Sequence, residues 1–161
     1  MNFVKMTRPV RPDDFELIEA VPGLIGVARD QDLKLFWSTR SFDRISPNGE
    51  FGQDPAGSTL DDFLPQSAAR EREQIHREVM STGQHASHYQ FLADHRLICT
   101  VFPLDEAAFG HRGVLAVLVD APVEATPGAG PDTPVLSSTS LNRFSALSSR
   151  ELEVLHYIAR G

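Results

Sequence analysis

Short apolar runs set the pattern of the first three quarters of the chain. Runs at residues 24–28 and 33–37 flank a polar turn, which predicts a hairpin of two strands. Runs at residues 87–92, 97–104 and 113–119 predict three further strands. The last run is almost wholly apolar, as is typical of a central strand that is buried on both faces.

One long amphipathic stretch, residues 66–82, separates the two groups of strands. Ala68, Ile75 and Val79 share one side of a helix of this length, and Gly83 is a typical helix stop. Three shorter helices are expected at residues 13–21, 41–45 and 59–64. The order of strands, helices and strands predicts an α+β fold in which the long helix covers one face of a sheet.

Beyond this region the composition changes. Residues 123–144 are rich in Pro, Gly, Ser and Thr and poor in large apolar side chains, so they predict a linker. Helical periodicity then returns, and Ser148 and Glu151 are spaced as a capping box. The sequence thus divides into an N-terminal extension (1–13), a compact domain (14–122), the linker (123–144) and a C-terminal helix (145–161).

The C-terminal helix has a specific sequence pattern. Its matching residues are Leu147, Ser148, Arg150, Glu151, Glu153, Val154 and Leu155. They closely resemble the first helix of the LuxR-type (GerE-like) helix-turn-helix domain. The resemblance implies that the parent protein regulates transcription and that this chain holds only the first helix of its DNA-binding domain. DNA would then be contacted only through the region after Gly161.

Phrases in the compact domain occur in the order known from PAS domains. Pro22-Gly23 precedes the first strand, and residues 57–60 precede residues 61–65. Residues 79–83 precede the third strand, and residues 102–105 lead to the last strand. Residues 14–122 are therefore similar to the PAS fold. The resemblance implies a five-stranded antiparallel sheet with helices on one face, enclosing a small cavity. Ser38, where many such domains have Asn, and an apparent insertion at residues 47–55 depart from the pattern.

The net charge and the cysteine content limit the range of functions and compartments that fit the chain. The net charge of −7 and the sequence pI of about 5.3 give no basic surface of the kind that DNA-binding domains use. The single cysteine, Cys99, fits a reducing compartment. Neither a signal peptide nor a membrane-spanning run is recognised, so we expect a cytoplasmic protein that does not enter a membrane.

Aromatic and aliphatic side chains from the sheet and the helices are expected to line the cavity. The candidates are Phe36, Phe42, Phe63, Ile75, Val79, Phe91 and Phe102. His76 is a candidate axial ligand for haem, because PAS domains that bind haem take such a ligand from this helix. Its neighbours Arg72, Glu73 and Arg77 favour a solvated position instead, and no cofactor is the default expectation.

Other chemistry has less support. His85, His88, His95 and Cys99 match no familiar metal spacing, and His85 and His88 would point to opposite faces of a strand, so no metal site is expected. No nucleophile elbow, phosphate loop or zinc-protease motif is present, so we do not expect an enzyme.

The sequence therefore predicts the sensory part of a transcription regulator. A small ligand or partner would bind the PAS-like domain and control a LuxR-type DNA-binding domain, and the protein would be a homodimer because helix-turn-helix proteins typically read two half-sites. The alternative is a PAS-like domain with a closed core and no ligand, which serves only for protein interaction or dimerisation.

Overall fold

The computed structural model describes residues 8–44, 56–92 and 95–121, together with Arg150, Glu151, Val154, Tyr157 and Ile158. Those last five residues are helical. The predicted linker, the remainder of the predicted C-terminal helix and the apparent insertion at residues 47–55 lie outside the described residues.

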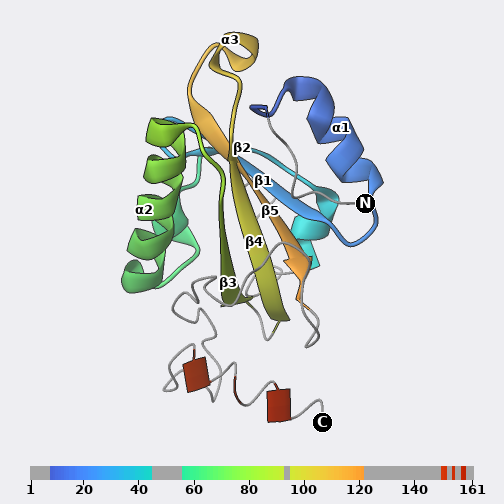
Figure 1. Ribbon diagram of the computed structural model, residues 1–161, viewed down its shortest axis with the longest axis vertical. Coiled ribbons are helices and arrows are strands. Elements are labelled where there is room, and N and C mark those ends of the chain that lie inside the picture. The colour runs from blue at the N-terminus through green and yellow to red at the C-terminus, as the bar shows by residue number, and fades with distance from the viewer. Residues whose placement is uncertain are drawn as a thin grey trace.

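Five antiparallel strands form one sheet. They are β1 (Ile25–Asp30), β2 (Leu35–Ser38), β3 (Ala86–Leu92), β4 (His95–Pro103) and β5 (Gly113–Asp120). Their order in the sheet is β2-β1-β5-β4-β3, so the nearly apolar β5 is the central strand, as its sequence predicts (Figure 1). The predicted α+β fold with a five-stranded antiparallel sheet is confirmed.

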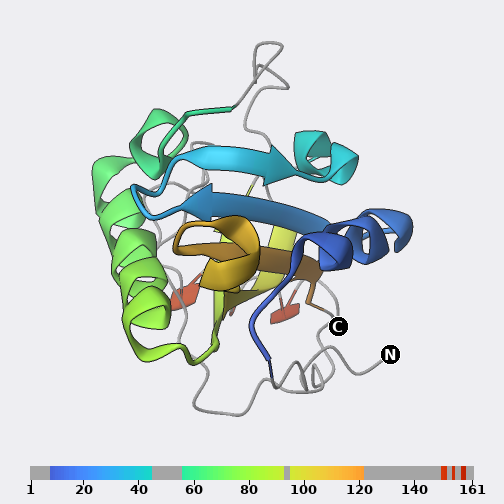
Figure 2. The same cartoon turned by 90° about the horizontal axis from the view of Figure 1, so that it is seen from above.

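Helices lie on both sides of the sheet, and not on one face only as the PAS resemblance implies. They are α1 (Pro12–Ala20), the 3-10 turns η2 (Arg40–Arg44) and η3 (Leu60–Asp62), α2 (Gln66–Thr82) and the short α3 (Glu106–Phe109). The long helix α2 covers one face together with η3, while α1 lies against the opposite face (Figure 2). The sequence did not predict α3, which Asp105 caps by accepting hydrogen bonds from the backbone N–H groups of Ala107 and Ala108.

The helix α2 has the predicted bounds and stop. Its C-cap, Gly83, has a φ of 69°, a conformation that glycine adopts without the strain a side chain would add. The buried stripe of the helix combines small or apolar residues at Ala68 and Val79 with polar residues at Arg72 and His76. This stripe packs on the sheet, so two polar side chains face inward.

Each face of the sheet has its own core. Ile25, Val27, Leu97, Cys99 and Val114 are among the buried residues on the α2 side. The opposite core, beneath α1, contains Val10, Ile18, Leu24, Ala28, Phe102, Leu104, Leu115 and Val117. Because both faces are covered, alternate side chains of the central strands are buried in either direction.

The packed body begins earlier than the predicted boundary at Asp14. Val10 has 0% exposure and bridges Leu104, and its N–H donates to the carbonyl oxygen of Pro103 at 2.9 Å. The Asp14 carboxylate accepts from the N–H of Arg11 at 2.8 Å and forms an ion pair with Arg8. Residues 8–13 are thus part of the domain surface and core.

Truncating Val10 should therefore destabilise the domain. We expect Val10→Ala to lower the free energy of unfolding by about 2 kcal/mol, because it leaves a cavity in a fully buried site. The matched control is Leu17→Ala on α1, where the side chain is 67% exposed and the expected change is within about 0.5 kcal/mol. Urea unfolding measures both, and equal effects would contradict the buried position of Val10.

Within the described part of the chain, no helix has the length and apolar character that crossing a bilayer requires.

Candidate functional site

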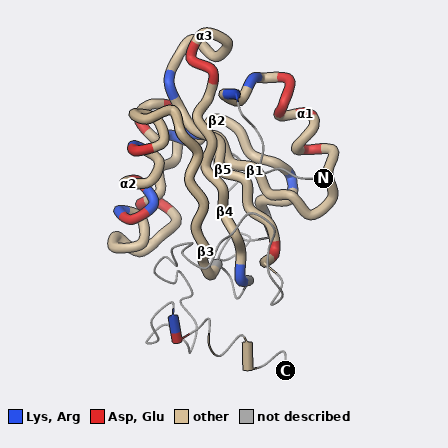
Figure 3. The backbone as a smooth tube through the Cα atoms, in the orientation of Figure 1, with Lys and Arg blue, Asp and Glu red and all other residues tan. Residues whose placement is uncertain are grey.

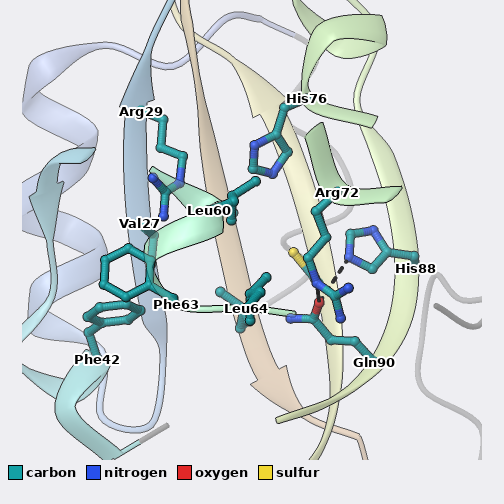
Figure 4. Close-up of a pocket in the computed structure, with 13 residues that line it drawn as sticks. Val27, Arg29, Phe42, Leu60, Phe63, Leu64, Arg72, His76, His88 and Gln90 are labelled. Carbon is teal, nitrogen blue, oxygen red and sulfur yellow. Dashed lines mark hydrogen bonds between the residues drawn. The ribbon is translucent and has the colours of Figure 1, made fainter. Parts of the chain in front are cut away.

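A cavity of about 80 Å³ lies between the sheet and the helical layer of α2, η2 and η3. Its volume corresponds to on the order of five to eight water-sized positions. The lining residues are Val27, Arg29, Phe42, Leu60, Phe63, Leu64, Arg72, His76, His88, Gln90, Cys99, Ala116 and Leu118 (Figure 4). The cavity thus has an apolar wall and a cluster of nitrogen-bearing side chains.

The apolar wall depends on the loop after β2. Phe42 of η2 and Phe63 after η3 meet edge to face, with ring centroids 6.4 Å apart. Thr39 fixes this loop on β1: its Oγ1 accepts from the N–H of Gly26 at 3.0 Å, and its own N–H donates to the oxygen of Gly26 at 2.9 Å. Two backbone groups of one glycine therefore hold the turn that presents Phe42.

Three buried polar side chains connect α2 to β3. The Arg72 Nε donates to Gln90 Oε1 at 2.9 Å, and Arg72 Nη1 donates to the carbonyl oxygen of Ala68 at 2.9 Å. His88 Nε2 lies 3.4 Å from the same Gln90 oxygen. Because a guanidinium only donates, Gln90 presents its oxygen here, and that oxygen only accepts. The proton of neutral His88 therefore sits on Nε2, and its Nδ1 is an acceptor.

Arg29 and His76 point into the same space from β1 and α2 (Figure 4). The Arg29 side chain lies 5.6 Å from the Phe63 ring centroid, and its Nη1 donates to the carbonyl oxygens of Leu33 at 2.9 Å and Ser58 at 3.0 Å. The Nδ1 atoms of His76 and His88 are buried and have no hydrogen-bond partner among the described residues. Unsatisfied buried polar atoms are uncommon in native structures, and each one calls for an explanation such as a bound water or ligand.

Burial sets the protonation of these groups. Burial, together with the charge of Arg29, lowers the pKa of His76 to about 3, and burial with the charge of Arg72 lowers the pKa of His88 to about 4. Burial also lowers the pKa of Arg29 and of Arg72 to about 10. At neutral pH both imidazoles are therefore neutral and both guanidiniums remain charged.

Cys99 is an unreactive thiol in this site. Burial raises the pKa of its thiol to about 12, so it is protonated at neutral pH and is not a nucleophile.

The predicted lining residues separate into three groups. Phe42 and Phe63 line the cavity. Val79 and Ile75 pack into the core on the same side of the sheet but do not line it. The other predicted residues, Phe36, Phe91 and Phe102, are not lining residues. Phe102 belongs to the core on the α1 side, where its neighbour across the strands is Leu115, and Phe36 packs near Phe15 and Phe109.

His76 lies inside the domain, with 4% exposure, and not in the solvated position that its charged neighbours favoured. His88, which the sequence analysis weighs only as a metal ligand, is also buried. Sequence reasoning missed Arg29, Arg72 and Gln90 as lining residues. The inward position of Arg72 and His76 could have been predicted from their spacing, because it places both on the same helical stripe as Ala68 and Val79.

The residues around His76 do not suit haem. A cavity of about 80 Å³ is much smaller than typical cofactor sites of a few hundred Å³, and Arg29 faces the imidazole across it. Among the described residues, no three His, Cys, Asp or Glu side chains gather closely enough to hold a metal ion.

Comparison with known proteins identifies the fold of the chain. No family model matches the chain, and no curated protein matches it. Two solved structures of VqmA are similar to this chain, each with a TM-score of 0.54. The first is the dimer from Vibrio cholerae, a LuxR-type receptor, in the absence of its target DNA. The second is VqmA bound to DPO. They are 19% and 20% identical and match 72% and 70% of this chain. The chain spans just over half of VqmA, 55% and 58% of those two chains.

A separate sensory domain shows the same architecture. The PAS domain of BvgS from Bordetella pertussis has a TM-score of 0.53 and 15% identity, and the match covers 70% of this chain and 89% of that domain. At these identities the likeness concerns the fold alone. The described body therefore has a PAS-like fold, as residues 14–122 predict.

The buried histidines predict a specific pH dependence of stability. Their folded-state pKa values lie below the ordinary 6.5, so the unfolded chain binds more protons and stability falls as the pH drops from about 6.5 toward 4. The expected loss at pH 5 is on the order of 2 kcal/mol for each histidine.

Urea unfolding at pH 7 and pH 5 measures this loss. His76→Leu should reduce the difference between the two pH values, while the control His85→Gln, at an exposed position before β3, should keep it. An unchanged difference in His76→Leu would show that His76 is not held neutral by burial.

Proposed function

We propose that this chain is the ligand-sensing part of a transcription regulator. The observation that carries the proposal is the cavity, in which buried arginine, histidine and glutamine side chains face an apolar wall. A few convergent polar groups in an otherwise apolar cavity are typical of small-molecule sites. The PAS-like fold, shared with a LuxR-type receptor and with the BvgS PAS domain, supports a sensory role over an enzymatic one.

The proposed output is a LuxR-type DNA-binding domain that begins within residues 145–161. Its support is the sequence pattern from Leu147 to Leu155. VqmA, which has been solved as a dimer and in a complex with ligand and DNA, offers a precedent for joining these parts. By the same comparison we propose a homodimer that binds DNA through the region after Gly161. Because DNA is the proposed target, the proposed location is the cytoplasm.

A contact at β3 suggests how the cavity influences that output. His88 and Gln90 line the cavity, whereas Tyr89 alternates to the other face of the strand. The Arg96 guanidinium lies 4.2 Å from the Tyr89 ring centroid and 5.2 Å from that of Tyr157, and Arg96 Nη2 lies 3.3 Å from the Tyr157 hydroxyl. The same strand thus contacts the cavity on one face and, through Arg96, the C-terminal helix on the other.

A screen of small molecules tests the sensing role. Mass spectrometry of compounds released from the purified protein, together with thermal-shift screening, should identify a ligand. The ligand should be lost in Ala116→Ile, which fills the cavity, and kept in Ala107→Ile on exposed α3. Circular dichroism checks that both variants fold. Ligands that bind equally to both variants, or no ligand at all, would favour the alternative of a domain for protein interaction only.

The Arg96 contact predicts that ligand and DNA binding are coupled through Tyr157. In the protein extended through its DNA-binding region, Tyr157→Ala should leave ligand affinity within about twofold but reduce the ligand's effect on DNA affinity by roughly fivefold or more. Tyr157→Phe keeps the ring over Arg96 and should be intermediate. Fluorescence anisotropy with labelled DNA measures the effect, and an unchanged ligand response in Tyr157→Ala would exclude this route.

A further inference from the structure

The side chains that line the cavity include two positive charges. Its two arginines are charged and its two histidines are neutral at neutral pH. None of the thirteen described lining residues is an aspartate or glutamate. A buried cation needs an opposite charge or a full set of hydrogen-bond acceptors. The chemistry of the lining thus favours a ligand that brings negative charge.

Arg29 is the clearest case. Its side chain is only 3% exposed, and the partners of its Nη1 are two neutral carbonyl oxygens. Among the ion pairs of the described residues, none involves Arg29. Asp62, Asp30 and Glu73 act on it only through longer-range attraction. The guanidinium therefore lies at the cavity with its charge incompletely compensated.

His76 and His88 add unsatisfied hydrogen-bonding atoms. Their Nδ1 atoms are buried and without a partner among the described residues, and both side chains line the cavity. His88 Nδ1 is an acceptor, as its bond to Gln90 requires, so it calls for a hydroxyl or N–H donor. His76 faces the space beside Arg29, and its neutral ring can donate or accept there.

We propose that this cavity binds a small organic anion whose carboxylate, or equally charged oxygen group, lies at Arg29 and His76. The apolar body of the anion packs against Phe42 and Phe63, and a hydroxyl or N–H group on it donates to His88. This inference rests on the proposed sensing function and adds the chemical class of the ligand. The cavity volume of about 80 Å³ limits that ligand to a compact molecule.

Matched pairs of probes test the charge directly. Isobutyrate with isobutyramide, and propionate with propionamide, have the same shape and heavy-atom count within each pair but differ by one charge. Ligands of this size bind with Kd near 1 mM, so titration calorimetry and thermal shift to about 10 mM are suitable. We expect a carboxylate to bind the wild-type chain at least tenfold more tightly than its amide.

A second measurement places the anion in the cavity. With imidazole nitrogens labelled with ¹⁵N, isobutyrate or propionate should shift the His76 Nδ1 resonance, whereas the exposed His85 should not respond. Arg29→Gln should abolish the preference for carboxylate. Because Arg29 also donates to Leu33 and Ser58, that variant is paired with the wild-type measurements, which do not depend on its folding.

The outcomes separate this inference from the proposed function. Equal affinity within each pair, tighter binding of the amides, or no binding of either carboxylate would overturn the anion proposal. If neutral compounds from the screen still bind and are lost in Ala116→Ile, the sensing function stands without it. If no compound of any charge binds, the proposed function itself fails.

Discussion

The hydrogen bond from Arg72 on α2 to Gln90 on β3 joins the helical layer to the sheet at the site where the cavity lies. Both side chains are buried, and a charged donor in a medium of low dielectric makes a strong bond. A guanidinium and an amide also prevent the close, purely apolar packing that a helix of alanine and valine would reach on a sheet. The cavity is therefore a consequence of polar residues placed at a helix–sheet contact.

The same arrangement gives β3 a place in the proposed coupling between the cavity and the DNA-binding region. It is an edge strand whose alternate residues face opposite ways, with His88 and Gln90 on the cavity side and Tyr89 on the other. A change in the partners of Gln90 alters a backbone that also carries the Tyr89 ring beneath Arg96. Arg96 is buried and contacts Tyr157. A displacement of the Tyr89 ring would therefore act on packed side chains and not on solvent.

The regular elements could be predicted from hydrophobic periodicity, including the bounds of α2 and the central place of β5. The cavity lining could be predicted only in part. Phe102 and Phe42 are both apolar and buried, yet they lie on opposite sides of a sheet that is covered on both faces, so burial alone does not assign the side. The prediction of a solvated His76 was wrong for another reason. Periodicity treats polar residues as solvated, whereas Arg72 and His76 belong to the inward stripe of α2.

Under the proposed sensing function, buried polar groups with unsatisfied hydrogen-bonding atoms have a physical use. Arg29, His76 and His88 lower the stability of the domain, because their charge or nitrogen atoms are incompletely matched within it. A ligand that satisfies them contributes its binding free energy to the fold and to the position of α2 on the sheet. A ligand shifts the equilibrium between two arrangements of the domain only by the difference in its affinity for them. In the proposed function, the polar groups supply this difference, because Arg72, His88 and Gln90 lie at the contact between α2 and the strand that carries Tyr89.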